Sequence, residues 1–440
     1  MKSQLKFALV SLVAFAGIAG LAGCGSITTS SAAGTSSAAG NDGKIGVILV
    51  GDESEGYTEA HMKGIDEAAA KLKISDRIIY KKKIGEDNNC TAAINDLHSE
   101  GCKLIVSNSY GHQDYMCDGA KNYTDTTFIA MTGDYAAISG RSNFRNAFVS
   151  IYQARYVSGV VAGMKLKSLI DAGALDETFN KDDKGNWKVG YVGAYSYAEV
   201  ISGFTSFYLG IKSVVSNVAM DVQFTNSWFD IAAEGSAADA LVKEGCVIIG
   251  QHADSTGAPA KVQSLLGTAR PNSTKKYVCY SVGFNIDMAS VAPDAALTSA
   301  LNIWEVYYEY AFSQFLAGKD IVNDWCKGYE ASAVDISPLN TKVVADGTAA
   351  KVTEVVSKIK DGSLQVFDTS SFTVDGAKVT TTEVNLSYMD WTTDPATVVY
   401  QGEKVNPIKT EKGITYFSES TYRAAPYFDM KIDGITWLNK

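Results

Sequence analysis

Residues 44–64, KIGVILVGDESEGYTEAHMKG, decide the fold of this chain of 440 residues. The run 45–50 is apolar without interruption, which is typical of a strand covered on both faces, as parallel strands in α/β sheets are. An acidic turn with glycines follows, and then a helical pattern. Because open α/β sheets bind ligands beyond the carboxyl ends of their strands, we expect small-molecule contacts to begin at this turn, with Asp52, Glu53, Tyr57 and Thr58. Asp52 and Glu53 are also explained as caps of the helix that follows.

The same alternation of strand and helix occurs twice along the chain. Apolar runs that predict strands begin near Ile45, Ile78, Leu104 and Thr127, and again near Lys188, Met220, Val247 and Tyr277. Helical periodicity lies between them. This repetition predicts an α/β fold with two doubly wound parallel-sheet lobes.

The lobes are expected to be joined more than once, because residues 147–151 and 296–303 both read as crossings between them. Several crossings make a hinge, and the cleft between the lobes becomes the binding site. The expected bounds are 44–148 plus about 303–320 for lobe 1, 149–300 plus about 321–364 for lobe 2, and 365–440 for a β-rich tail packed on both.

The first residues predict export. Lys2 and Lys6 precede an uncharged stretch, 7–23, and then Cys24, so residues 1–23 read as a secretory signal peptide. LAGC at 21–24 resembles a bacterial lipobox, which implies cleavage before Cys24 and lipid on its sulfur. The alternative is an ordinary signal peptide followed by a chance cysteine. Residues 24–43 are mostly Gly, Ser, Thr and Ala and predict a flexible tether to the outer face of the membrane.

Composition excludes several classes of function. A net charge of −10 argues against a nucleic-acid surface. The sequence contains no Gly-x-Ser-x-Gly elbow, no phosphate loop and no HExxH motif, so no motif of these kinds indicates an enzyme. The only metal-like cluster mixes hard and soft ligands, so we expect no metal or cofactor; it comprises His112, Asp114, Cys117 and Asp118. Six dilute cysteines besides Cys24 predict no disulfide scaffold, although a bridge among Cys90, Cys102 and Cys117 stays open.

Six segments carry a family resemblance: EGYTEAHMKG (55–64), IYQARYVSGVVAG (151–163), NSWFD (226–230), QHADS (251–255), GFNIDM (283–288) and LTSALNIW (297–304). In this order they resemble the basic membrane protein family of ABC-transporter substrate-binding lipoproteins, whose better-understood members are purine-nucleoside receptors. The resemblance implies a type I periplasmic-binding-protein fold, closure on a small ligand, and delivery to a membrane permease with an ATPase. We expect a monomer.

The resemblance places Tyr57 where the nucleoside receptors stack an aromatic ring on the base, which gains both buried area and offset stacking. The alternative is a tyrosine that fastens the loop to the helix. His61 lies one helical turn further on the same face, as a ligand partner or as a histidine bonded to backbone. In lobe 1 the residues after two further strands are Ser109, Tyr110 and Asp134, whose carboxylate is suited to sugar hydroxyls or to a turn.

In lobe 2, Phe204 is a candidate for the opposite side of an aromatic sandwich or for a core position. Trp228 lies in a polar loop and is either a ligand contact or an interlobe contact. Further candidates follow strands or the late crossing: His252, Asp254, Asn285, Asp287 and Trp304.

Two departures from the nucleoside receptors concern the ligand. Asn302 stands where they carry a lysine, and Thr58 where they carry an asparagine, which changes the pattern of groups accepted. The expected ligand is a purine nucleoside or related base, and the alternatives are a sugar or a flavin. Two other functions compete: a lipoprotein that senses a ligand and signals to a membrane receptor, and a surface adhesin.

Overall fold

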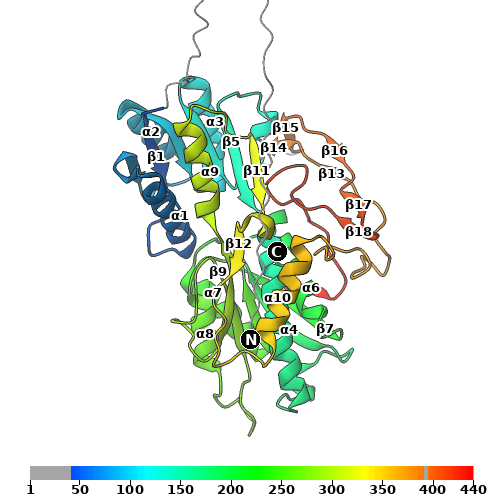
Figure 1. The fold of residues 1–440 in the computed structure, drawn as a ribbon. Helices are drawn as coiled ribbons and strands as arrows, with labels where there is room; N and C mark the ends of the chain where they lie inside the picture. The colour runs from blue at the N-terminus through cyan, green and yellow to red at the C-terminus, as the bar shows by residue number, and fades with distance from the viewer. Residues whose placement is uncertain (1–40, 391–394, 440) are drawn as a thin grey trace, which may run out of the picture. The chain divides into compact units, whose positions relative to one another are not determined.

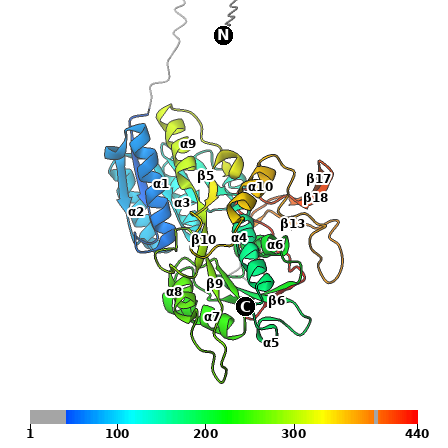
Figure 2. The same ribbon diagram turned by 60° about the horizontal axis from the view of Figure 1, so that its bottom comes forward.

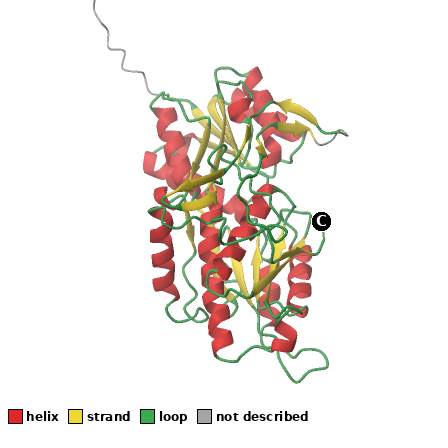
Figure 3. Ribbon diagram, turned by 90° about the vertical axis from the view of Figure 1, so that its right-hand side faces the viewer, coloured by secondary structure: helices red, strands yellow, loops and turns green. Residues whose placement is uncertain are grey.

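The computed structural model describes residues 41–390 and 395–439. The predicted signal peptide, Cys24 and nearly all of the predicted tether lie outside these residues. Two separate main sheets dominate the described chain (Figure 3). No helix in the described part is both long and apolar enough to span a membrane.

The first sheet has six strands, all paired in parallel. Their spatial order is β11 (Asp324–Lys327), β5 (Phe144–Val149), β4 (Thr127–Met131), β3 (Cys102–Ser107), β1 (Lys44–Ile48) and β2 (Ile78–Lys81). The helices of this lobe are α1 (Gly56–Leu72), α2 (Asn88–Ser99), α3 (Gln113–Asn122) and α9 (Trp304–Leu316). Its short 3-10 helices are η1 (Ser75–Arg77), η2 (Tyr110–His112) and η3 (Ala136–Ile138).

The second sheet has seven strands, of which only β12 is antiparallel to its neighbour. The order is β12 (Val334–Ile336), β10 (Ala296–Asn302), β9 (Tyr280–Phe284), β8 (Ile248–Gln251), β6 (Trp187–Gly193), β7 (Val218–Phe224) and β19 (Ile435–Trp437). Its helices are α4 (Ile151–Asp171), α5 (Glu177–Asn180), α6 (Ala198–Lys212), α7 (Ile231–Lys243), α8 (Gly257–Leu265) and α10 (Thr348–Lys360), and η4 (Tyr329–Ala331) precedes β12. The two doubly wound lobes are therefore confirmed.

Two close helix contacts depend on glycine. α4 and α6 lie side by side (Figure 2), and a Cβ on Gly159 would come within 2.2 Å of the carbonyl oxygen of Phe207. A Cβ on Gly64 would come within 2.7 Å of the backbone nitrogen of Glu305, where α1 meets α9 (Figure 1). Only glycine permits such contact. The second contact attaches the helix after β10 to lobe 1, so the chain returns there as expected.

The expected bounds of the lobes are wrong at one strand. Residues 321–327 were expected in lobe 2, but β11 pairs in parallel with β5 at the edge of the first sheet. The chain therefore returns to lobe 2 after β11, on the way to β12, and not before β11. Short strands of this kind carry too few residues for a pattern to show which sheet they join.

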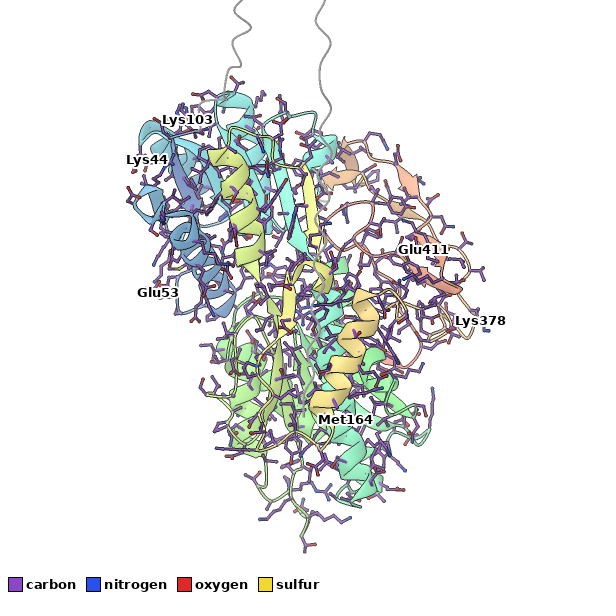
Figure 4. The ribbon with its side chains drawn as sticks, viewed as in Figure 1. Lys44, Glu53, Lys103, Met164, Lys378 and Glu411 are labelled. Carbon is purple, nitrogen blue, oxygen red and sulfur yellow. The ribbon has the colours of Figure 1, made fainter. Side chains whose placement is uncertain are left out.

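The tail lies along both lobes, coloured orange to red in Figure 1. It contains three two-stranded ladders: β13 (Val384–Asn385) with β16 (Lys404–Val405), β14 (Tyr388–Asp390) with β15 (Thr397–Tyr400), and β17 (Ile408–Glu411) with β18 (Ile414–Phe417). Lys378 and Glu411 mark its outer side in Figure 4. Phe367, Phe417 and Phe428 are buried in the same apolar cluster as residues of both lobes, so the tail packs on them.

The tail makes specific contacts with each lobe. On lobe 1, the Tyr388 hydroxyl donates to Asp114 at 2.9 Å and its ring lies 4.2 Å from that of Tyr135. On lobe 2, β19 pairs with β7, and Trp437 meets Phe224 edge to face at 5.5 Å. The tail therefore bridges both lobes.

Candidate ligand-binding site

A cavity lies between the lobes, at the carboxyl ends of the strands of both sheets. It contains about 660 Å³ of space free of protein atoms, solvent at its mouth included. Lobe 1 and α9 supply Val50, Glu55, Tyr57, Glu86, Ser109, Tyr110, Thr132, Phe148 and Trp304, and lobe 2 supplies Glu199, Trp228, His252, Asp254, Phe284 and Asn302.

Tyr57 reaches the cavity from the first turn of α1. The sequence predicts this residue in the turn before the helix, but the helix already begins at Gly56. Its hydroxyl donates to the backbone oxygen of Asn108. Its ring meets the His61 ring edge to face at 4.5 Å. The hydrogen bond fastens the helix to the loop, as one interpretation of Tyr57 predicted, and it holds the ring at the cavity wall, where stacking on a ligand stays a prediction.

Behind Tyr57 lies a buried aromatic group. His61 stacks on Trp304 with ring centroids 4.3 Å apart, and its Nδ1 lies 2.7 Å from the hydroxyl of Tyr308. Burial lowers the pKa of His61 well below its usual value, so the ring is neutral. Only Trp304 of this stack lines the cavity, and its buried Nε1 has no hydrogen-bond partner. His61 therefore supports Trp304.

Thr58 is fully buried and is not among the lining residues of the cavity. Its hydroxyl donates to Glu55 at 2.5 Å and accepts from the side-chain amide of Asn108 at 3.2 Å. Asn108 also accepts from the backbone nitrogen of Val50 at 2.9 Å. This network holds the Glu55 carboxylate at the wall.

Asp52 and Glu53, the acidic pair of the predicted turn, lie outside the cavity lining. They form surface ion pairs with Lys83 at 2.5 Å and Lys82 at 3.0 Å, and Figure 4 shows Glu53 at the periphery. Neither caps α1: the N-cap is Glu55, and its side chain accepts no hydrogen bond from the backbone nitrogens of the first turn. Both sequence interpretations of this pair are wrong.

Asp134 lies outside the cavity lining and contacts the tail. Its carboxylate lies 3.3 Å from Arg423 and 3.5 Å from the hydroxyl of Tyr110, which does line the cavity. Burial raises the pKa of Asp134. The residue predicted to bind a ligand thus positions Tyr110 instead.

Three lobe 2 candidates also lie outside the cavity lining. Phe204 is buried between Tyr191 and Trp437, at 6.0 and 5.9 Å, so the core interpretation is correct. Asp287 is exposed and accepts from the backbone nitrogen of Ala289. Asn285 donates from its side chain to Asp254 at 2.6 Å and accepts from Asn302 at 2.9 Å, which holds two cavity residues.

Two lobe 2 loops are joined by one buried carboxyl group, that of Glu234 near the start of α7. It accepts from the backbone nitrogens of Asp230 at 3.1 Å and Ser255 at 3.2 Å. The backbone nitrogen of Asp254 donates to the carbonyl of Trp228 at 2.7 Å. Burial raises the pKa of Glu234 to about 7. These contacts keep Trp228 and Asp254 at the cavity.

His252 contacts Glu199 across the lobe 2 wall, with Nε2 3.2 Å from the carboxylate. Burial, and after it the charge of Arg155, lowers the pKa of His252 to about 4. The ring is therefore neutral at pH 7, and it lies 6.3 Å from Trp228. Trp228 itself packs against Tyr195 at 5.1 Å.

Seven of the fifteen candidates named from the sequence, with Asp52 and Glu53 counted, line the cavity: Tyr57, Ser109, Tyr110, Trp228, His252, Asp254 and Trp304. The lining also contains residues that were not named: Val50, Glu55, Glu86, Thr132, Phe148, Glu199 and Phe284. Val50, Glu55 and Thr132 follow strand ends, so the rule that found the others would have found them. Thr132 has the left-handed φ of 63°, which is rare for a β-branched residue.

The described residues contain no cluster of His, Cys, Asp and Glu suited to a metal ion. The six described cysteines are free thiols, which resolves the open bridge among Cys90, Cys102 and Cys117.

Residues 44–370 match the model of a protein family described as Bmp, ABC transporter substrate-binding protein PnrA-like. The chain belongs to this family. Its members are solute-binding proteins and not enzymes, in agreement with the motif analysis.

Three relatives differ in what their names say they bind. A purine-binding protein of Brucella abortus is 29% identical over 325 residues, 74% of this chain and 83% of that protein. A candidate ABC transporter glucose-binding protein of Haloferax volcanii is 28% identical, with 47% of this chain and 44% of that protein covered. An ABC transporter nucleoside-binding protein of Lactococcus lactis is 26% identical, with 38% and 42% covered. The last two matches span less than half of those proteins.

Among solved structures, an ABC transporter solute-binding protein of Conexibacter woesei superposes with a TM-score of 0.54 at 19% identity. The match covers 73% of this chain and 97% of that protein. At this identity the likeness shows the fold alone, and it confirms the expected fold class.

Proposed function

We propose that this protein is the receptor of an ABC importer, binding a purine nucleoside or related base between its lobes. The observation that carries the proposal is a cavity whose aromatic walls come from both lobes, with Tyr57 and Trp304 on one side and Trp228 on the other. Aromatic walls suit a planar heterocycle, which gains area and offset stacking. The purine-binding and nucleoside-binding relatives support the same ligand class.

Polar groups at the wall fit the remainder of a nucleoside. Ser109, His252 and Asp254 all line the cavity. Carboxylates accept hydrogen bonds from ribose hydroxyls, and hydroxyls can donate or accept. Because the ligand would touch both lobes, its binding would favour a closed arrangement of the hinge.

Delivery to a membrane permease and its ATPase follows from the importer role. Lipid on Cys24 would hold the receptor at the outer face of the membrane, with the segment after it as a tether. Replacing Cys24 by Ala should release the protein from the membrane fraction, and retention of the variant there would contradict the anchor.

A thermal-shift screen tests the ligand class, because a ligand that binds only the folded state raises the melting temperature. Nucleosides and purine bases should raise it, whereas glucose and riboflavin should not. A rise in the melting temperature with glucose alone would contradict the proposed ligand class and indicate a sugar receptor. Small-angle scattering with and without the ligand should show a smaller radius of gyration on binding, and an unchanged radius would contradict closure.

A further inference from the structure

Carboxylates stand on both walls of the cavity. Glu55 and Glu86 come from lobe 1, and Glu199 and Asp254 come from lobe 2. No lysine or arginine is among the lining residues of the described chain. Like charge on two facing walls disfavours closure unless something between them compensates it.

The four carboxylates have only neutral partners. Glu55 accepts from a threonine hydroxyl, Asp254 from an asparagine amide, and Glu199 contacts the neutral His252. Glu86 accepts from the hydroxyl of Ser109 at 2.5 Å and from a backbone nitrogen at 3.0 Å. Along the described residues, none of the four lies within 4.0 Å of a lysine or arginine nitrogen, unlike acids of the surface such as Asp52.

The buried cation in this region is Arg155, which is set behind the wall. Its guanidinium carbon lies 3.8 Å from the centre of the Phe284 ring, and the guanidinium donates to Tyr191 at 2.6 Å and to the carbonyl of Gln251 at 2.9 Å. One positive charge behind a ring therefore faces four acidic groups, and among the described residues the cavity wall itself carries no cation.

Burial makes the negative charge of these groups costly and favours their protonated forms. Burial first, and neighbouring carboxylates second, raises the pKa of Asp254 well above its usual value, and the same two causes raise the pKa of Glu55. A positive charge in the cavity would favour the ionised forms and remove this repulsion. The side-chain oxygen of Asn302, buried at the wall without a partner, is a further acceptor that calls for a donor.

The apolar part of the wall is also suited to a cation. Six lining residues are Tyr, Phe or Trp: Tyr57, Tyr110, Phe148, Trp228, Phe284 and Trp304. The faces of such rings attract cations, and desolvation increases the attraction. Rings with acceptors between them recognise a flat group that bears positive charge.

We propose that the ligand of this cavity is a cationic heteroaromatic molecule, such as a purine nucleoside whose base carries a positive charge. The inference rests on the proposed function, because it assigns the charge of the ligand in the same site. The acidic walls then select charge, and the aromatic walls select the ring.

The test is calorimetric titration of the wild-type chain with two isomers at neutral pH. 1-Methyladenosine is cationic there, whereas N6-methyladenosine has the same atoms and a neutral base. The cation should bind at least about tenfold more tightly. Thiamine, a cationic heterocycle that is no purine, and adenosine complete the set.

Variants identify the groups responsible. Glu55→Gln and Glu199→Gln keep the shape of the side chain and remove its charge, so each should weaken 1-methyladenosine about fivefold or more and leave N6-methyladenosine within about twofold. Glu59→Gln, on the exposed side of α1, is the matched control and should change neither. The comparison of isomers needs no variant, so it stands even where a substitution impairs folding.

The outcomes separate this inference from the proposed function. Equal or tighter binding of the neutral isomer overturns the cationic ligand and leaves the purine receptor intact. Binding of thiamine without any nucleoside supports the cationic ligand and overturns the purine receptor. Failure of all four probes overturns both.

Discussion

Glu234→Gln should change how the stability of this protein depends on pH. The Glu234 carboxyl is fully buried, and its pKa is raised from 4.5 to about 7 in the folded chain. As pH rises above the lower value, the unfolded chain loses this proton first, so the folded state becomes relatively less stable until the folded pKa is passed. Glutamine does not titrate, so the variant lacks this loss.

The magnitude follows from the shift. A shift from 4.5 to about 7, at about 1.4 kcal/mol for each pH unit, amounts to about 3 kcal/mol. An unfolding entropy of about 2 cal/mol/K per residue gives roughly 0.8 kcal/mol/K for a chain of this size. The melting temperature of the wild type relative to the variant should therefore fall by about 4 °C between about pH 4 and about pH 8.

Differential scanning calorimetry of both chains across this range measures the effect. Only the difference between the chains is interpreted, since other groups titrate equally in both. Glu67→Gln, at an exposed position of α1, is the control and should stay parallel to the wild type. If Glu234→Gln also stays parallel, its carboxyl is not held protonated by burial and the reasoning fails.

Two further predictions concern binding and the tail. Tyr57→Ala and Trp228→Ala should each weaken nucleoside binding by about 1 kcal/mol or more in calorimetry, because each removes an aromatic wall; unchanged affinity in both would refute the site. Phe428→Ala should lower the free energy of unfolding in urea by about 3–5 kcal/mol, because this ring is fully buried and stacks on Phe367 at 4.3 Å. Tyr422→Ala, on an exposed ring of the same tail, should cost little, and equal losses would show that packing on the lobes is not responsible.

The sequence predicts the strands and the edge where the site forms, for one physical reason. Parallel strands covered on both faces need long apolar runs, and their carboxyl ends meet at one edge. Ser109, His252 and Asp254 reach the cavity by this rule. Asp287 obeys the same rule but lies three residues past the end of β9, where the turn directs it to solvent.

The positions of the other site residues depend on contacts between segments that are distant in the sequence. Asp134 forms an ion pair with Arg423 of the tail, and no feature of the lobe 1 sequence predicts this partner. α6 is buried almost throughout, so its sequence does not distinguish a core position such as Phe204 from a cavity position. Glu86 reaches the cavity from the loop after β2, a short strand at the edge of the sheet.

The last strand of the tail has a consequence for solubility. β19 covers the outer edge of β7, whose amide and carbonyl groups would otherwise form an open row. Such a row is a template for pairing with another polypeptide. A chain ended at residue 370, where the family match stops, would lose β19 and expose that row. β19 therefore replaces the seven-residue edge of β7 with an edge of three residues, and a shorter edge strand offers fewer groups for such pairing.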